Sequence, residues 1–426
     1  MNCRRGLAPR RSEIQLFQRC DYAITALSRG CVAIRYEVFL VSGVFVYDPF
    51  EPEFQQQSHA VYRRLRDEFP VYHNPQREFW AISRFQDVWD AANDSARFSV
   101  EGVEEAQTLL PMLNFLDPPR HDRLRGLVSR AFTPRRVAEM EPRIRTIARE
   151  LLDGFGPNGV GELVEDYATP LPGRVIADMI GVPPDRRETF LHWTRMMLST
   201  DPDKSIEETI RTPSERIYEE FSHLIEERRS QRRDDLVSAL LDAEIEGRGL
   251  SDPEIQGFCF QLIVAGNDTT TSLIGNGAVL LAQHPEQRAF LARDPKNIPA
   301  AVEEMLRFEP PAQALPRSAG PNVELHGQPI PQGARVLLVW AAANRDEREF
   351  ALPASFDVRR KFKRHLALGH GIHSCLGASL ARLEARVAFE ELLARIPEYV
   401  ITQEPVWVTS RWARAHPAIP IVFEAT

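Results

Sequence analysis

The stretch from Ser251 to Pro285 constrains the fold most strongly, because it predicts a single helix of thirty-odd residues. Ser251 and Glu254 form an S-x-x-E capping box at its start, and Pro285 is the next helix breaker. At 1.5 Å per residue, such a helix is about 45 Å long. A helix of that length crosses a whole domain, so the remaining chain must surround it with a large body.

The rest of the chain supplies mostly helices for that body. Helical patterning dominates from about residue 54 to residue 309, with proline-containing breaks such as Asp117-Pro118-Pro119. From Val323 to Val339 the pattern changes to short strands with a Gly turn, and Thr402 to Phe423 is similarly strand-like. We see no internal repeat and no Gly/Ser linker. The sequence therefore predicts a mainly α fold with a small β region, in which residues 44–426 form a single domain.

The first 43 residues differ from the rest, since they are rich in Arg and contain three of the five Cys residues, Cys3, Cys20 and Cys31. The apolar stretch from Val38 to Tyr47 is too short for a membrane span, which needs about 20 residues. We predict that residues 1–43 are a disordered extension or a start-site artefact, and that the protein is cytoplasmic with no membrane partner. The net charge of −8 argues against nucleic acid as a partner.

The middle of the predicted long helix has an unusual composition. The residues from Ala265 to Thr271 read Ala-Gly-Asn-Asp-Thr-Thr-Thr, which are mostly poor helix formers, whereas the flanking residues are apolar. Polar groups in a buried helix conflict with local preference, and such conflicts are expected at functional sites. The alternative is a harmless kink in which Thr hydroxyls bond back to the preceding turn. This segment alone leaves both interpretations open.

The residues from Leu368 to Gly377 form the densest cluster of chemically active side chains. A zinc site would use His365, His370, His373 and Cys375, but these lack the usual paired spacing. A phosphate-binding loop would use Gly369 and Gly371, but a third glycine and a preceding strand are missing. The third possibility is Cys375 as a single thiolate ligand at the N-terminus of a helix. A lone Cys ligand, with glycines that allow a large flat cofactor to approach, suits haem.

This cluster resembles the haem-binding loop of the cytochrome P450 family. Gly369-x-Gly371-x-His373-x-Cys375-Leu376-Gly377 matches the family pattern at every position but the first, where Leu368 replaces the usual Phe. Ala265 to Thr269 resembles the family's oxygen-activation segment, and Glu304-Met305-Leu306-Arg307 resembles its E-x-x-R motif. The segment from Asp117 to Arg125 is similar to soluble bacterial members. The resemblance covers about residue 44 to the end and implies a cytochrome P450-like fold, with haem between the long central helix and the Cys loop.

The resemblance implies a role for each matching residue. Cys375 would be the axial thiolate ligand of haem b, and Asp268 and Thr269 would be the catalytic pair that delivers protons to dioxygen. Four cationic side chains would hold the haem propionates: His121, Arg125, Arg317 and His373. Four further residues would lie against the cofactor: Ala265, Gly266, Gly369 and Gly377. Glu304, Arg307 and Arg360 would form a buried structural charge network rather than a catalytic site.

By resemblance, the protein would be a monomeric monooxygenase that oxidises a small apolar organic substrate with O2. Two electrons would come from a separate ferredoxin and ferredoxin reductase, because no flavin or nicotinamide motif is present. Five cations in six residues, Arg359 to Arg364, together with Arg130, Arg135 and Arg136, predict a basic face that steers an acidic ferredoxin, although an ordinary solvated charge run would look the same. The rival function is a haem-binding sensor or sequestering protein without turnover.

The same resemblance predicts which segments line the substrate pocket. They are Phe98 to Phe115, Phe190 to Asp201, Ile263 to Ala265, Ala312 to Leu315 and the turn at Trp412. Their Phe, Leu and Met residues indicate an apolar substrate and do not identify it.

Overall fold

The computed structural model describes residues 45–103, 112–129, 132–156, 158–198, 211–245, 247–408 and 413–424. All of them belong to one compact unit, Val38–Thr426. The predictions made from the sequence for residues 1–43, Arg130 and Trp412 concern residues outside this described part. No helix among the described residues is long and apolar enough to cross a membrane.

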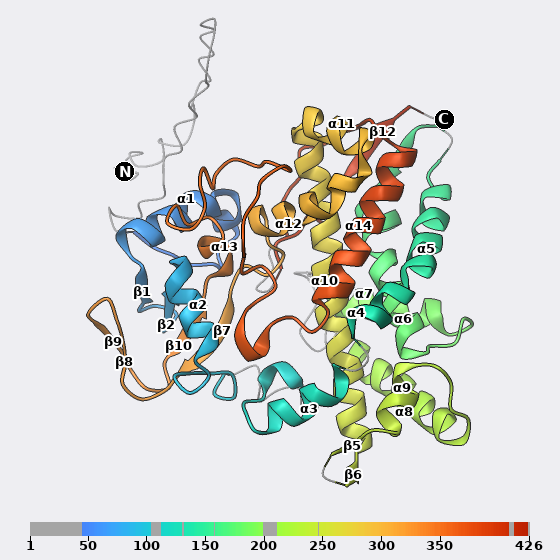
Figure 1. The fold of residues 1–426 in the computed structure, drawn as a ribbon, viewed down its shortest axis with the longest axis horizontal. Helices are drawn as coiled ribbons and strands as arrows, with labels where there is room; N and C mark the ends of the chain where they lie inside the picture. Colours follow the sequence, from blue (N-terminus) through green and yellow to red (C-terminus); the bar gives the residue numbers. More distant parts are fainter. Residues whose placement is uncertain are drawn as a thin grey trace, which may run out of the picture. The chain divides into compact units, whose positions relative to one another are not determined.

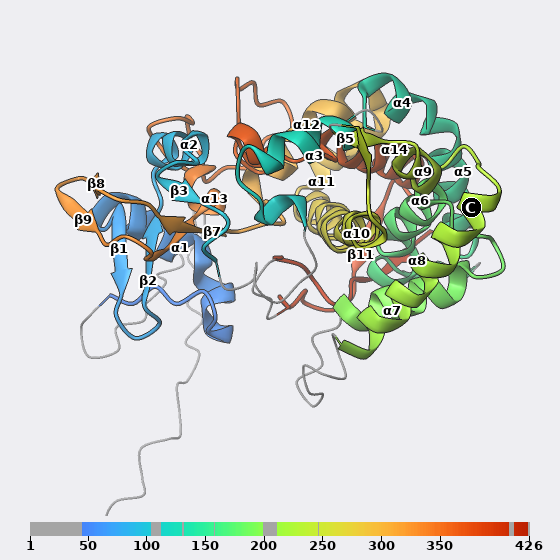
Figure 2. The same ribbon diagram turned by 90° about the horizontal axis from the view of Figure 1, so that it is seen from below.

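Helix α10 (Asp252–Gln283) runs through the centre of this unit as 32 continuous helical residues (Figures 1 and 2). The Ser251 side chain and the Glu254 side chain form the predicted capping box at its start, and the helix ends immediately before Pro285. The Gly, Asn, Asp and Thr residues in its middle therefore do not interrupt the helix. The sequence-based prediction of one long central helix is confirmed.

Two groups of elements lie on opposite sides of α10 in Figure 2. One side is helical and consists of α4 (Pro134–Glu139), α5 (Glu141–Asp153), α6 (Pro170–Ile180), α7 (Arg187–Leu198), α8 (Thr212–Ser230) and α9 (Leu236–Leu241). The other side contains α1 (Pro52–Glu68), α2 (Phe85–Asn93), α13 (Trp340–Ala343) and the main sheet. The remaining helices are α3 (Arg120–Val128), α11 (Pro285–Arg293), α12 (Ile298–Phe308) and α14 (Ala378–Arg395).

The main sheet has five strands in the order β1 (Val71–Asn74), β2 (Phe79–Ile82), β10 (Arg335–Leu338), β7 (Leu315–Ala319) and β3 (Phe98–Ser99). A second sheet has the order β11 (Tyr399–Ile401), β12 (Pro420–Phe423) and β4 (Val160–Glu162). Two hairpins complete the set, β5 (Glu244–Ile245) with β6 (Arg248–Gly249) and β8 (Val323–Leu325) with β9 (Gln328–Ile330).

The predicted mainly α fold with a small β region is confirmed, and one local prediction needs correction. Helices dominate the range 54–309 as predicted, with the short strands β1 to β6 between them. Within Thr402 to Phe423, the strand β12 covers only Pro420–Phe423. These strands are two to four residues long, and several of them pair with strands distant in the sequence, such as β2 with β10. Strands that short carry too little periodicity to be recognised alone.

Candidate functional site

The loop from Leu368 to Gly377 passes closely against α2 before it enters α14. Gly371 has φ of +69°, and a Cβ atom there would lie 2.3 Å from the backbone oxygen of Ala92, so no other residue fits this position. The imidazole of His370 stacks on Trp89 of α2, with ring centroids 3.4 Å apart. The Cys375 amide donates to the Leu368 oxygen at 2.8 Å and closes the loop. The loop therefore holds Cys375 in a defined position directly before α14.

Cys375 has an accessible thiol although the protein surrounds it on most sides. Its side chain is exposed, whereas Cys259, on α10, is fully buried. Burial raises the pKa of the Cys375 thiol, and the Gly377 amide and the Arg125 guanidinium oppose this effect. A Cβ atom on Gly377 would meet no protein atom within 4 Å, so protein packing does not require a glycine there. An accessible thiol and, two residues later, a glycine with open space beside it fit a large bound cofactor.

Four cationic side chains gather beside this loop. The rings of His121, on α3, and His373 lie 4.6 Å apart, and Arg125 donates to the Ser374 oxygen at 2.6 Å. Arg317, on β7, is 5% exposed, and its Nη1 donates to the Pro316 oxygen at 2.8 Å. Burial lowers the pKa of Arg317 to about 10. The structure thus brings together the four residues that the sequence predicted for binding carboxylates.

These four side chains lack enough acidic partners within the protein. The Nε2 atoms of both His121 and His373 are buried without a hydrogen-bond partner. Each histidine has one acid beside it, because Asp122 Oδ1 lies 2.9 Å from His121 Nδ1 and Asp117 Oδ1 lies 3.8 Å from His373 Nε2. Asp117 also accepts a hydrogen bond from the Ser99 hydroxyl. Unpaired buried donors and cations destabilise a protein unless a ligand satisfies them. Two carboxylates of a bound cofactor would supply that charge.

The residues from Ala265 to Thr269, in the middle of α10, differ in their contacts and in their exposure. The Thr269 hydroxyl donates to the Ala265 oxygen at 2.7 Å, which is the back-bonded geometry of the simpler alternative. Ala265 is exposed, and Asp268 and Thr269 are half-buried. A Cβ atom on Gly266 would lie 2.8 Å from Cδ1 of Ile176, so this glycine also allows α10 to pack closely on α6. The predicted contact of Gly266 with a cofactor remains a prediction.

Asp268 is the strongest acid–base candidate on this helix. Its side chain has no ion pair among the described residues, and burial raises its pKa from 3.8 to about 6. A carboxyl group with a pKa near neutral can both accept and release a proton at working pH. The arrangement therefore supports proton transfer along this face of α10.

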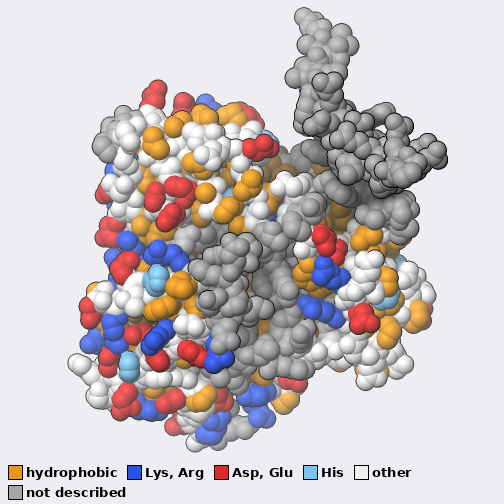
Figure 3. Space-filling model, turned by 180° about the vertical axis from the view of Figure 1, so that it is seen from behind, with side chains coloured by type: hydrophobic (Ala, Val, Ile, Leu, Met, Phe, Trp, Pro, Cys, Tyr) orange, Lys and Arg blue, Asp and Glu red, His pale blue; other side chains and the backbone are white. Residues whose placement is uncertain are grey.

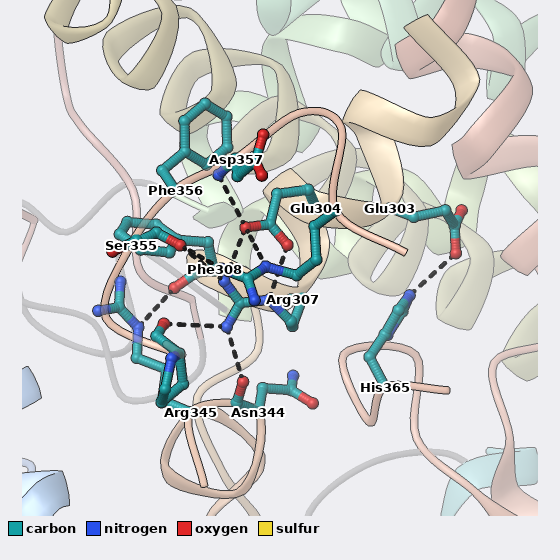
Figure 4. Close-up of polar contacts among 12 residues, drawn as sticks. Glu303, Glu304, Arg307, Phe308, Asn344, Arg345, Ser355, Phe356, Asp357 and His365 are labelled. Atoms are coloured by element: carbon teal, nitrogen blue, oxygen red, sulfur yellow. Dashed lines mark hydrogen bonds and ion pairs between the residues drawn. The ribbon is translucent and has the colours of Figure 1, made fainter. Parts of the chain in front are cut away.

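The predicted structural charge network is confirmed (Figure 4). Arg307 donates twice to Glu304, at 2.7 Å from both Nε and Nη2, and both side chains are fully buried. Arg360 adds a contact from Nε to Glu304 Oε1 at 3.0 Å. Arg307 also donates to the backbone oxygens of Asn344 and Pro353. This network ties α12 to the segment before the Cys loop.

Sequence reasoning missed Gln261, on α10. Its Oε1 accepts a hydrogen bond of 2.7 Å from the Leu113 amide, in the short 3-10 helix η2 (Leu113–Phe115). The available signal was a single amide side chain inside the apolar run from Phe258 to Ala265.

Parts of the predicted pocket lining, residues 104–111, 199–201 and Trp412, lie outside the described residues.

The zinc alternative receives no support from the described part of the chain. No group of three or more His, Cys, Asp or Glu side chains there could hold a metal ion. His365 instead pairs with Glu303 at 3.0 Å, as Figure 4 shows, and His370 is stacked on Trp89.

Comparison with known proteins decides the family. The family model described as Cytochrome P450 matches residues 189–294 and 296–402. The chain belongs to the cytochrome P450 family. It is 39% identical over 342 residues to "Putative cytochrome P450 YjiB" of Bacillus subtilis, which covers 79% of this chain and 86% of that protein. It is also 38% identical over 397 residues to "Vitamin D(3) 25-hydroxylase" of Pseudonocardia autotrophica, covering 89% of this chain and 97% of that protein.

The fold agrees with this membership. The solved structure of cytochrome P450 CYP109Q5 from Chondromyces apiculatus superposes with a TM-score of 0.83 at 40% identity, covering 89% of this chain and 98% of that chain. P450 proteins carry haem iron with a cysteine thiolate ligand, so this chain is a haem monooxygenase. The accessible Cys375 thiol and the unpartnered Nε2 atoms of His121 and His373 fit that cofactor.

Proposed function

We propose that Cys375 is the axial ligand and that His121, Arg125, Arg317 and His373 bind the two haem propionates. The observation that carries this assignment is the accessible Cys375 thiol close to the buried Nε2 atoms of His121 and His373, which have no hydrogen-bond partner among the described residues. Arg125 supports it twice, because its guanidinium holds the Ser374 backbone and its charge stabilises the neighbouring thiolate. Ala265, Gly266, Gly369 and Gly377 would leave room for the flat ring.

When bound, haem supplies the iron centre at which P450 proteins activate dioxygen. The protein's own contribution is to move protons. Asp268 would take a proton from solvent at its carboxylate and release it toward the Thr269 hydroxyl, one residue away on α10. The Thr269 hydroxyl, which donates to the Ala265 oxygen, would accept hydrogen bonds at its free lone pairs and so hold a proton relay in place.

The electrons would come from a ferredoxin that docks on a basic groove near Cys375. The groove has a cavity volume of about 530 Å³, and its lining includes Lys361, Lys363, Arg382 and Cys375. Two of the five clustered cations are neutralised, since Arg360 pairs with Glu304 and Arg364 pairs with Glu349. Lys361 and Lys363 are exposed and have no ion pair among the described residues. They would carry the steering charge.

On a different face of the protein, the described residues carry mixed charges. Lys and Arg side chains on the face in Figure 3 are intermixed with Asp and Glu. Mixed charges produce little net field beyond the Debye length, which is about 8 Å at physiological salt. An acidic ferredoxin would therefore be steered toward the groove.

The substrate would be a small apolar organic molecule. The similarity to a protein named as a vitamin D(3) 25-hydroxylase supports apolar ligands of that general character. The described part of the predicted lining agrees, because Ile263 of α10 and Leu113 and Phe115 of η2 are apolar.

Turnover with a plant-type or bacterial ferredoxin and its reductase tests this function. We expect oxygenated product from an apolar substrate panel, at a rate that falls as salt rises. The double variant Lys361→Glu/Lys363→Glu should lose most of that salt dependence and bind ferredoxin about tenfold more weakly. The control Lys296→Glu makes the same change on the 3-10 helix Pro295–Asn297, outside the groove lining, and should behave like the wild type. Salt-independent turnover would contradict the steering role.

The domain assignment stays a proposal. We expect that a chain beginning near residue 44 binds haem as the full chain does, because every site residue lies after Phe45. The cytoplasmic location and the monomeric state stay predictions of the sequence, which cell fractionation and gel filtration would test.

A further inference from the structure

Gln261 is the one amide side chain in the apolar run from Phe258 to Ala265. It is half-buried on α10, between the buried residues Phe260 and Ile263 and beside the half-buried Leu262. A polar side chain in such surroundings is costly unless its hydrogen bonds are used. Its position therefore calls for a specific role.

Helix geometry places Gln261 on the same face as the proposed site. Residues 261, 265 and 269 are spaced by four, so they follow one stripe of the helix. Ala265 is exposed on that stripe, and the Thr269 hydroxyl bonds to the Ala265 oxygen. At 1.5 Å per residue, Gln261 lies about 6 Å before Ala265 along the axis and about 12 Å before Thr269.

The contact with η2 fixes the orientation of the amide. The Leu113 backbone N–H is a donor, so the atom that faces it at 2.7 Å must be the oxygen Oε1. Nε2 then points away from this contact, and no described residue accepts a hydrogen bond from it. Nε2 of Gln261 consequently offers two N–H donors that no described residue uses.

We propose that Gln261 selects substrates that carry a hydrogen-bond acceptor, such as a carbonyl or hydroxyl oxygen, about one helical turn from the position that is oxidised. The inference rests on the proposed function, because it assumes that the Ala265–Thr269 stripe borders the reacting part of the substrate. Leu113 N–H would act as a positioning group, since it holds the amide in the orientation that presents Nε2. Gln261 itself is a specificity-determining residue and takes no part in proton delivery.

Three probes of nearly equal size separate the hydrogen-bonding contribution from apolar fit. They are 2-decalone, which only accepts hydrogen bonds, 2-decalol, which donates and accepts, and decalin, which does neither. Dissociation constants come from the spin-state shift of the Soret band of the ferric holoenzyme. For the wild type we expect 2-decalone and 2-decalol to bind about tenfold more tightly than decalin.

Two variants of Gln261 then change the polarity of the group. Gln261→Glu keeps an oxygen for the Leu113 amide but replaces the donor by an acceptor. The variant should therefore bind 2-decalone about tenfold more weakly, whereas its affinity for 2-decalol, which can donate a hydrogen bond, should not change. Gln261→Met removes both the hydrogen-bond donor and the acceptor. The dissociation constants of the three probes should then lie within about threefold of one another. The control Gln256→Glu makes the same substitution on α10, at a residue whose Nε2 donates to Ser222, and should leave all three constants unchanged.

The outcomes distinguish this inference from the proposed function. A holoenzyme with the thiolate-type Soret band and normal ferredoxin-driven turnover, but with equal wild-type affinity for 2-decalone and decalin, would overturn the role of Gln261 alone. An unchanged ketone preference in Gln261→Glu, or no spin-state shift with any probe, would also overturn it. Loss of the thiolate signature in the wild type would instead contradict the proposed function.

Discussion

Replacing Asp268 by Asn should stabilise the protein and slow its turnover at the same time. The carboxyl group has no ion pair among the described residues, and burial raises its pKa from 3.8 to about 6. At 1.36 kcal/mol per pH unit, holding this group ionised in the folded state costs about 3 kcal/mol. Asn has nearly the same shape and no charge, so the variant avoids that cost.

The pH dependence follows from the direction of the pKa change. Because the folded-state pKa is above the unfolded one, the wild type loses stability as pH rises from about 4 to about 6, and the loss is constant at higher pH. The free energy of unfolding of Asp268→Asn should therefore exceed that of the wild type by up to about 3 kcal/mol at pH 7.5, and by about half of that at pH 5. Turnover should fall by roughly 100-fold, which is a common contribution of acid–base groups.

Urea unfolding of the two holoenzymes at both pH values, followed by far-ultraviolet circular dichroism, measures the stability difference. Glu384→Gln is a matched control, because Glu384 is a buried carboxyl on α14 whose pKa burial raises to about 8, and it lies outside the proposed machinery. It should gain stability and keep normal turnover. An Asp268→Asn variant with lower stability at pH 7.5, or with unchanged turnover, would refute this reasoning.

Three further substitutions test other parts of the site. Thr269→Ala should keep full haem content but divert electrons into hydrogen peroxide, measured as peroxide formed per NADH consumed; unchanged coupling would contradict its proton role. Arg317→Met should release haem to apomyoglobin at least about tenfold faster, yet stabilise the haem-free protein, since it removes a buried charge that lacks a close counter-ion. Arg307→Met should lower stability by about 3 kcal/mol because Glu304 loses two charged hydrogen bonds and keeps only Arg360 as a cationic partner, and Glu304→Gln should restore part of the loss in the double variant; a single variant as stable as the wild type would contradict the buried pair.

The sequence predicted those features that depend on neighbouring residues. The capping box of Ser251 and Glu254 defines where α10 begins, and the glycine-rich segment before Cys375 defines a loop that approaches a cofactor. Features that depend on distant residues were not predictable. The strand β2 is paired with β10, more than 250 residues later, and Arg364 is neutralised by Glu349 only because the chain folds back there.

The proposed role of Gln261 is another feature that depends on residues distant in the sequence. Its role depends on the contact with Leu113, 148 positions earlier, and nothing in the local helix pattern indicates that contact. For Gly266, the structure adds a second role that the sequence did not indicate. The resemblance placed this glycine against the cofactor, and the structure shows that its lack of a side chain also lets α10 pack closely against Ile176.

The reduced carbon monoxide difference spectrum of Cys375→Ser tests the central assignment most directly. The wild type and the control Cys259→Ser, which alters the buried cysteine of α10, should both show the thiolate-type Soret band. Cys375→Ser should lose that band even in preparations that retain haem. A thiolate-type band that persists in Cys375→Ser, or wild-type protein that contains zinc and no iron, would contradict the account.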